Sequence, residues 1–337
     1  MTIFFDNAYI NNKVVIAGPF LIDGPLSGFD DTYSDFYDGE KTFEDCEIKE
    51  LEKSVSLLLK KESIYNKDID ILISADLTNQ LVVSNVVANR VEIPYLGIYN
   101  ACASFCEGLI IASSMIENGV KNIICTASSH NLTSERQFRS PIEYGGPKPD
   151  YSTFTVSAAT SCLVSNKECG IRIESGTIGK VIDLGVKDAF DMGSVMAPGA
   201  ADTLNRHLSD TNRDSSYYDL ILTGDLGKYG REIFKEYCSK EYGYKLDNYD
   251  DSACLIYNNK DRRVKSGGSG PACLPVYFFS EIIPRMKKKE IKRVLLLSTG
   301  ALHSTTSVNQ KKSIPSVCHA VSVEVIWYFY IHSYLQV

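Results

Sequence analysis

The second half of this chain repeats sequence patterns of the first half, and this repeat limits the possible folds more than any other feature. Three pairs of segments correspond in the same order: 70–77 (DILISADL) with 219–226 (DLILTGDL), 101–102 (AC) with 272–273 (AC), and 121–124 (KNII) with 292–295 (KRVL). The first pair lies 149 positions apart (219 − 70) and the other two 171 (273 − 102 and 292 − 121), which fits an insertion within 231–265. Ordered matches of this kind indicate a duplicated domain.

The local pattern alternates between strands and helices. Apolar residues at helical spacing, with charges on the opposite face, predict an amphipathic helix over 45–62. The other elements expected in the first half are strands over 69–76, 94–99 and 121–126 and helices over 79–91 and 104–118. Such alternation is typical of layered α/β proteins, so we expect an α/β fold made of two similar halves.

The composition is that of an ordinary globular protein. The chain has 337 residues, of which 44% are hydrophobic and 23% charged, and a formal net charge of −7. No basic block stands out, so nucleic acid is not an expected partner. We expect no signal peptide and no membrane-spanning helix, because the chain has neither the start of a secretory signal nor a run of about 20 apolar residues. The ten cysteines lack the spacing of a zinc site, so we expect free thiols and no metal.

Cys102 stands directly before the apolar helix expected over 104–118. A thiol at the amino end of a helix faces the positive end of the helix dipole, which lowers the thiol pKa and attracts anions. From the spacing alone, however, an ordinary buried cysteine is the better interpretation, because free cysteines commonly pack in cores. Which of the two interpretations holds depends on the context of Cys102 in the fold.

Four long segments supply that context. They are 128–150, 179–203, 219–227 and 267–273. Together with the strand, turn and helix around Cys102, they resemble the stage V sporulation protein AD family of spore-forming bacteria, over residues 15–324. The resemblance implies a thiolase-like fold, a five-layered αβαβα sandwich of two duplicated halves, which we expect at 1–172 and 173–325. Residues 326–337 form an apolar tail that does not resemble the end of the family.

The same resemblance implies a function. It points to a component of a spore-membrane transport complex that binds dipicolinic acid (pyridine-2,6-dicarboxylate) and takes part in its uptake during sporulation and its release at germination. Other stage V sporulation A membrane proteins are the implied partners, and the implied location is peripheral, at the spore inner membrane. Thiolase-like folds pair through an edge strand, so we expect a homodimer. The ligand is expected as the free acid or as its calcium chelate, with no cofactor.

The residues that assist the cysteine in condensing enzymes are missing from the expected places. Condensing enzymes that resemble this fold carry His after the repeated strand, where this chain has 223–225 (TGD), and Asn or His before the second central helix, where it has 267–270 (GGSG). A thiol without these partners is not a working condensing nucleophile. We therefore expect ligand binding without catalysis. The alternative is an acyltransferase or condensing enzyme that acts through Cys102.

Five side chains are candidate ligand contacts: Cys102, Asp191, His319, Arg136 and His130. Asp191 either accepts from a protonated or metal-linked ligand or caps a helix. His319 would supply positive charge if ligand binding raised its pKa. Arg136 and Arg139 either pair with ligand carboxylates or hold their loop through nearby acids. His130 follows a strand and is either a pocket residue or a hydrogen bonder that orders a loop.

Two further histidines are not assigned to the site. His207 lies in a polar stretch with helical spacing, so we expect a solvent-exposed side chain. His303 follows the repeated strand of the second half, but its neighbours Ser304 and Thr305 indicate an ordinary loop.

Overall fold

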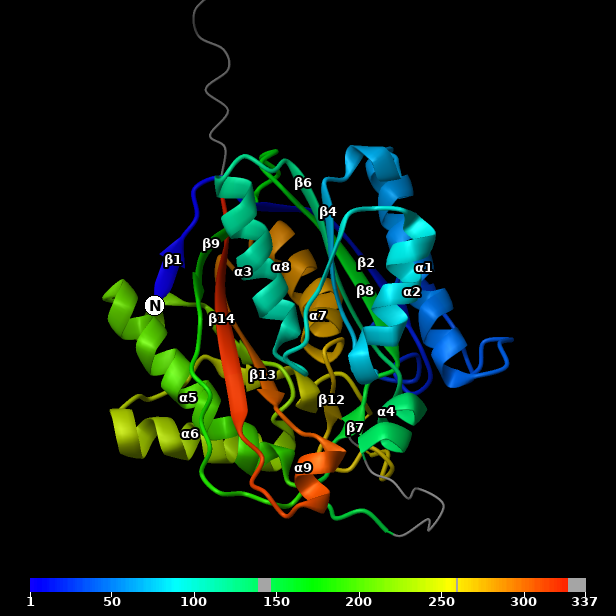
Figure 1. Ribbon diagram of the computed structural model, residues 1–337. Helices are drawn as coiled ribbons and strands as arrows, with labels where there is room; N and C mark the ends of the chain where they lie inside the picture. Colours follow the sequence, from blue (N-terminus) through cyan, green and yellow to red (C-terminus); the bar gives the residue numbers. More distant parts are fainter. Residues whose placement is uncertain (139–146, 259, 327–337) are drawn as a thin grey trace, which may run out of the picture.

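The computed structural model describes residues 1–138, 147–258 and 260–326 (Figure 1). Its largest feature is a mixed twelve-stranded sheet in which each half of the chain contributes a run of five strands with the same order. The first run is β5 (Tyr95–Gly97), β4 (Ile71–Ala75), β6 (Asn122–Ser129), β8 (Ala158–Ser165) and β2 (Tyr9–Ala17). The second run is β11 (Tyr249–Asp251), β10 (Leu220–Thr223), β13 (Arg293–Ala301), β14 (Ser316–Val325) and β9 (Ile171–Thr177).

The strand directions also correspond between the two runs. In each run the first three strands are parallel and the last two are antiparallel to their neighbours. The equal order and equal directions confirm the duplication predicted from the sequence repeat. The runs join at one residue pair between β2 and β9, Tyr9 with Arg172. Since β9 begins at Ile171, the division made from the sequence between residues 172 and 173 falls inside this strand.

Four short strands lie outside the two runs. β1 (Thr2–Phe4) pairs with β9 and β3 (Asp31–Thr32) pairs with β2. β7 (Phe154–Thr155) and β12 (Gly268–Ser269) pair with each other in a small separate sheet. Because β7 comes from the first half and β12 from the second, this small sheet ties the two halves together.

Helices cover both outer faces of the sheet runs and fill the space between them (Figure 1). The outer helices are α1 (Phe43–Glu62) and α2 (Val82–Val91) on the first run and α5 (Met192–Thr211) and α6 (Gly227–Tyr242) on the second. The central helices are α3 (Ser104–Glu117), α7 (Cys273–Tyr277) and α8 (Ile283–Lys287), the last two joined by a π-helical turn over Phe278–Ile282. The layers therefore alternate as helix, sheet, helix, sheet and helix, which confirms the five-layered αβαβα sandwich.

The remaining helical elements are short. Among the described residues they are α4 (Asn131–Phe138), α9 (Thr305–Asn309) and 3-10 turns at Asn66–Asp68, Asn79–Leu81, Ser215–Tyr217 and Ser252–Cys254. The turn at Asn79–Leu81 corrects one expectation, a helix from residue 79. Regular helix begins only at Val82, because Gln80 and Leu81 both have a left-handed φ of 58°. Left-handed backbone is unfavourable for residues other than glycine, so this turn interrupts the helical pattern.

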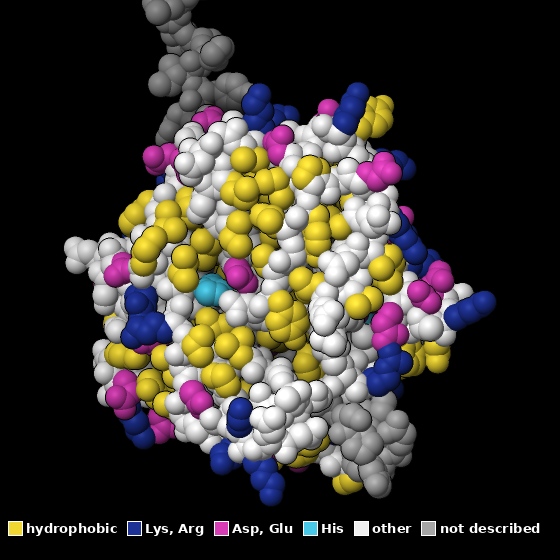
Figure 2. All heavy atoms as spheres, viewed as in Figure 1, with side chains coloured by type: hydrophobic (Ala, Val, Ile, Leu, Met, Phe, Trp, Pro, Cys, Tyr) yellow, Lys and Arg dark blue, Asp and Glu magenta, His cyan; other side chains and the backbone are white. Residues whose placement is uncertain are grey.

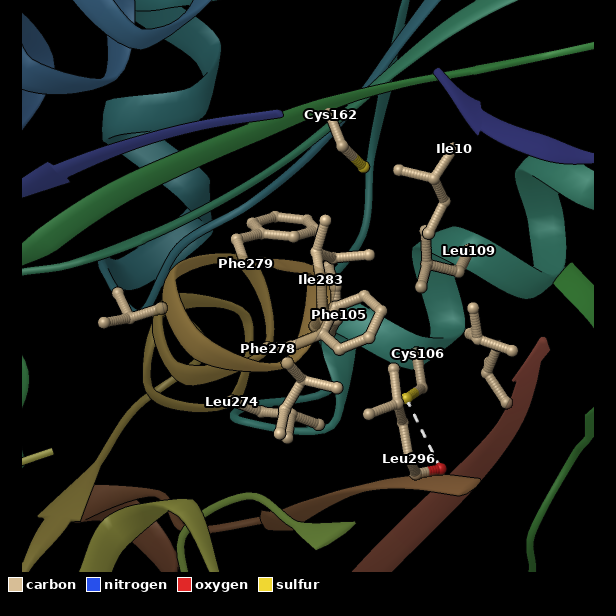
Figure 3. Packing of buried hydrophobic residues seen from close by; sticks show 14 of the residues in the cluster. Ile10, Phe105, Cys106, Leu109, Cys162, Leu274, Phe278, Phe279, Ile283 and Leu296 are labelled. Carbon is tan, nitrogen blue, oxygen red and sulfur yellow. Dashed lines mark hydrogen bonds between the residues drawn. The ribbon is translucent and has the colours of Figure 1, made fainter. Parts of the chain in front are cut away.

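Aromatic side chains join α3 to the π-helical turn between α7 and α8. The ring centroid of Phe105 in α3 lies 5.6 Å from that of Phe279 and 6.4 Å from that of Phe278 (Figure 3). Cys106 of α3 lies on the side of the helix that faces β13, where its thiol contacts a backbone carbonyl (Figure 3). Such close packing in the central layer fixes α3, and with it the turn that carries Cys102 at the amino end of α3.

None of the helices in the described residues is long and apolar enough to cross a membrane. Of the apolar tail at 326–337, only Ile326 belongs to the described residues. Residues 327–337 lie outside them.

Candidate functional site

A cavity that opens to solvent lies at the amino end of α3, between the two halves of the sandwich. Its lining residues are Leu77, Tyr99, Ala101, Cys102, Phe138 and Thr155 from the first half and Ala189, Met192, Met196, Asp225, Ser269, Gly270, Ala301 and His303 from the second. The lining is mostly apolar and, among the described residues, includes no Lys or Arg. On the face of the molecule shown in Figure 2, apolar side chains gather across the middle, and Lys and Arg lie mostly toward the edge.

A sharp turn presents Cys102 to this cavity. Ala101 adopts a left-handed φ of 50°. The backbone N–H of Asn100 donates to Ser104 Oγ at 2.9 Å, and Ser104 Oγ donates to the carbonyl of Ala101 at 2.8 Å. Strand β13 packs so closely behind the turn that a Cβ atom on Gly300 would lie 2.4 Å from the Asn100 carbonyl oxygen. The turn is therefore held from both sides, and only glycine allows this approach of β13.

The Cys102 thiol is not activated. Burial raises its pKa well above the usual value, the Asp225 carboxyl raises it further, and the Gly270 N–H acts in the opposite direction. Part of the side chain remains accessible, but a thiol with a raised pKa stays protonated at neutral pH and is a poor nucleophile. The expectation that the helix dipole lowers this pKa is wrong, because burial and the neighbouring carboxyl outweigh the dipole.

Asp225 follows β10 at one of the positions where condensing enzymes of similar sequence pattern would carry a histidine. Its side chain is buried, and its Oδ1 accepts a hydrogen bond from Thr299 Oγ1 of β13. Burial raises the pKa of Asp225 to about 7; Asp251 contributes to the rise, whereas Cys102 and Thr299 lower it. The thiol of Cys102 is thus next to a weak acid and not next to a base.

His319 lies on β14, behind the Cys102 turn and outside the cavity lining. Its Nε2 is 2.9 Å from the Asn100 side-chain nitrogen, and its Nδ1 is 3.3 Å from the backbone nitrogen of Gly179. Burial lowers the pKa of His319 to about 4, so the ring is neutral at pH 7. In this position His319 supports the turn that presents Cys102.

Asp191 and Arg136 both contact protein groups. Asp191 is the N-cap of α5, where its Oδ1 accepts from the backbone N–H of Ser194 at 3.2 Å, and the next residue, Met192, lines the cavity. Arg136 of α4 is half exposed and forms an ion pair with Glu44 of α1. Arg139, the second arginine of that segment, lies outside the described residues.

His130 is buried at the start of α4. Its Nε2 lies 3.0 Å from the carbonyl oxygen of Phe36, and its ring stacks on Phe43 with centroids 5.5 Å apart. Burial lowers the pKa of His130 to about 4. Of the five candidate ligand contacts, the structure therefore brings Cys102 into the cavity lining and places the other four around it.

Besides Cys102, three titratable side chains in the described lining were not selected as ligand contacts from the sequence: Tyr99, Asp225 and His303. His303 is not confined to an ordinary loop, since it faces the cavity with its ring centroid 5.3 Å from that of Phe138. The sequence did hold a signal for His303. It follows β13 as His130 follows β6, so the repeat places both at the same edge of their sheet runs.

Comparison with known proteins gives one family. The model of the family described as stage V sporulation protein AD matches residues 1–324, a range that begins earlier than residue 15. The stage V sporulation protein AD of Bacillus subtilis (strain 168) is 42% identical over 325 residues, which cover 96% of this chain and 96% of that protein. These matches confirm the resemblance seen in the sequence.

Solved structures of condensing enzymes share the fold. A variant of OleA from Xanthomonas campestris matches with a TM-score of 0.59 at 14% identity, covering 96% of this chain and 99% of the other. The 3-oxoacyl-[acyl-carrier-protein] synthase III of Aquifex aeolicus matches with a TM-score of 0.54 at 12% identity and equal coverage. At such low identity these likenesses show the thiolase-like fold alone.

Proposed function

Because the chain belongs to the stage V sporulation protein AD family, we propose that it serves sporulation by binding dipicolinic acid, without turnover, in the cavity beside Cys102. In this proposal it is the dipicolinate-binding component of a transport complex at the spore inner membrane. There it would take part in uptake during sporulation and release at germination. Membership of the family over nearly the whole chain supports the role in sporulation.

The observation that carries the proposal is a mostly apolar cavity between the two halves whose cysteine lies next to a carboxyl group. Condensing enzymes need a nucleophile activated by a base. Here burial and Asp225 both raise the pKa of Cys102, so the thiol is kept protonated. A protonated thiol next to a carboxyl group supports binding of a small molecule in this cavity without covalent attack by Cys102.

The lining suits a flat aromatic acid. Aromatic and thioether side chains such as Tyr99, Phe138, Met192 and Met196 offer apolar surface to a pyridine ring. The amino end of α3 and the backbone N–H of Gly270 offer hydrogen-bond donors to carboxylate oxygens. Since none of the described lining residues is Lys or Arg, a dianion would gain little from ionic pairing with them. The lining therefore favours a ligand whose charge is neutralised by a proton or by chelated calcium.

Calorimetric titration with dipicolinate, in the presence and absence of calcium, tests this proposal. Isophthalate is the matched control ligand, because it keeps both carboxylates and lacks the ring nitrogen. We expect saturable binding of one dipicolinate per chain and weaker binding of isophthalate. No binding of dipicolinate in either form would overturn the proposal.

The alternative function is acyl transfer through Cys102, which the fold of the condensing enzymes favours. Incubation with acyl-coenzyme A followed by intact-protein mass spectrometry separates the two. An acyl group on Cys102 would support the enzyme, and an unmodified chain would support the binding protein.

The proposal also includes partners. Other stage V sporulation A membrane proteins would hold the protein peripherally at the spore inner membrane. Deleting those proteins in a sporulating host should release this chain from the membrane fraction. Membrane association that survives deletion of all of them would contradict this part of the proposal.

A further inference from the structure

The two halves use their repeated aspartates differently. In the first half both carboxyl oxygens of Asp76 accept hydrogen bonds from the backbone. Its Oδ1 accepts from the N–H of Thr78 at 2.7 Å, and its Oδ2 accepts from the N–H of Ser84 at 2.8 Å. In the second half the equivalent residue by sequence repeat is Asp225. The repeat alone therefore predicts a second turn-capping aspartate.

A different residue performs that task in the second half. Asp251, on the adjacent strand β11, accepts the backbone N–H groups of Leu226 and Gly227 at 3.1 and 3.0 Å, at the start of α6. Asp225 is thereby released from capping and lines the cavity with Cys102. Its Oδ1 accepts from Thr299. Its Oδ2 makes no hydrogen bond of good geometry among the described residues, although the Cys102 thiol and the Gly270 N–H lie near the carboxyl and lower its pKa.

The surroundings of Asp225 disfavour a charged carboxylate. Its side chain is only 1% exposed, and a buried carboxylate with an unpaired oxygen is costly. The ionisable groups that act on it are the Asp251 carboxyl from β11 and the thiols of Cys102 before α3, Cys273 in α7 and Cys318 on β14. None of these is a cation, and His303 is the one histidine among the described residues of the cavity lining.

We propose that Asp225 takes part in ligand binding as a neutral carboxylic acid, which donates a hydrogen bond from Oδ2 to an anionic oxygen of the ligand, so that anion and proton enter the cavity together. The identity of the anion, dipicolinate, rests on the proposed function above. A neutral acid beside an anion also accounts for a dicarboxylate site without Lys or Arg in its lining. The carboxyl of Asp225 replaces them as the donor.

The pH dependence of dipicolinate binding follows from the linkage between ligand binding and proton binding at Asp225. Burial raises the pKa of free Asp225 to about 7, and an anion bound next to it raises that pKa further. Below pH 7 the acid already holds its proton, so the dipicolinate affinity should not change with pH through Asp225. Above pH 7 binding must take a proton from solution, so the affinity should fall by up to about tenfold per pH unit.

The test is calorimetric titration with dipicolinate from pH 6 to 8.5 in two buffers that differ in ionisation enthalpy, which yields the number of protons taken up per ligand. With a pKa near 7, we expect uptake of about 0.1 proton at pH 6 and about one at pH 8.5. Asp225→Asn keeps an N–H donor of the same shape and cannot titrate, so its uptake should be close to zero at both pH values. His303→Gln is the matched control, because it removes the other titratable group of the lining and should retain the uptake.

The outcomes are distinct. Dipicolinate binding by the wild type without proton uptake overturns this inference and leaves the proposed function standing, as does full uptake by Asp225→Asn. Loss of uptake in His303→Gln alone would assign the proton to His303 and equally overturn the inference. Absence of binding at every pH overturns the proposed function and this inference with it. Should Asp225→Asn not fold, infrared difference spectra of the wild type at pH 8.5 decide the matter, because the inference requires a protonated carboxyl band to appear on ligand addition.

Discussion

His319 Nε2 lies 2.9 Å from the side-chain nitrogen of Asn100, which connects the last strand of the second half to the turn that carries Cys102. The contact joins residues 219 positions apart. It explains how a histidine outside the cavity can affect what the cavity binds. The position of Cys102 depends on both halves of the sandwich, since Gly300 of β13 also lies against this turn.

Substitution of His319 should therefore loosen the Cys102 turn. We expect His319→Ala to weaken dipicolinate binding by about tenfold, since a lost buried hydrogen bond costs on the order of 1.5 kcal/mol. His319→Gln, which can still reach the Asn100 amide, should lose less. Calorimetric affinities of the two variants check this, and equal affinities for His319→Ala and the wild type would show that the contact does not position the site.

The Cys102 thiol should react slowly with alkylating reagents. Because its pKa is raised well above the usual value, little thiolate exists at neutral pH. Cys169 is exposed and serves as the internal reference. We expect peptide mapping after limited iodoacetamide treatment at pH 7.5 to show modification of Cys169 first. Faster modification of Cys102 would indicate an activated nucleophile and would favour the enzyme alternative.

The edge strand β5 should mediate a homodimer. It ends the first strand run, and Leu96 on β5 and Tyr99 just after it are 42% and 45% exposed. An exposed apolar edge of this kind is a site for strand pairing. We expect light scattering to give a dimer for the wild type and a monomer for Leu96→Lys. Tyr229→Lys, on the distant helix α6, is the control and should remain dimeric. A monomeric wild type at micromolar concentration would contradict this prediction.

Buried histidines should make the fold sensitive to acid. Burial lowers the pKa of His130 to about 4, whereas the unfolded chain titrates near 6.5. Between these values the unfolded state binds more protons, so the stabilising effect of the neutral ring is complete above pH 6.5 and is lost as the pH falls toward 4. The slope per histidine is at most about 1.4 kcal/mol per pH unit.

His130→Phe tests this sign, because phenylalanine retains the contacts with Phe36 and Phe43. Urea unfolding at pH 7, 6 and 5 should show a smaller loss of unfolding free energy for the variant than for the wild type. The comparison between the two chains cancels the contribution of the other titrating groups. Parallel pH profiles would mean that His130 is already neutral in the unfolded state or charged in the folded one.

Much of the fold was predictable because the repeat and the apolar periodicity are local features of the sequence. The parallel strands β4, β5 and β6 and the helices α1 and α3 follow from the periodicity, and β10 and β13 follow from the repeat. The side-chain environments did not follow in the same way. His207 was expected to be exposed, yet it is buried between Thr177 and Tyr218, with its two ring nitrogens 2.6 Å from the hydroxyl oxygens. A polar stretch in one helix does not show which of its faces packs on β9.

The candidate site could be predicted from the sequence even less well than the environment of His207. The pKa of Cys102 depends on Asp225, which lies 123 positions away (225 − 102) and comes from the other half of the sandwich. Asp225 in turn faces the cavity because Asp251 caps α6 in its place. The sequence repeat predicts equal roles for Asp76 and Asp225, and only the packing of β11 against β10 makes them differ.

The most direct test of the central claim is the binding of dipicolinate to the wild type and to Cys102→Trp, measured by calorimetry under identical conditions. Tryptophan at position 102 would fill the space beside Tyr99 and Asp225 without adding charge, and circular dichroism would verify that the variant is folded. The account predicts saturable binding by the wild type and none by Cys102→Trp. Equal binding by both proteins, or no binding by the wild type, would contradict the claim that this cavity is the dipicolinate site.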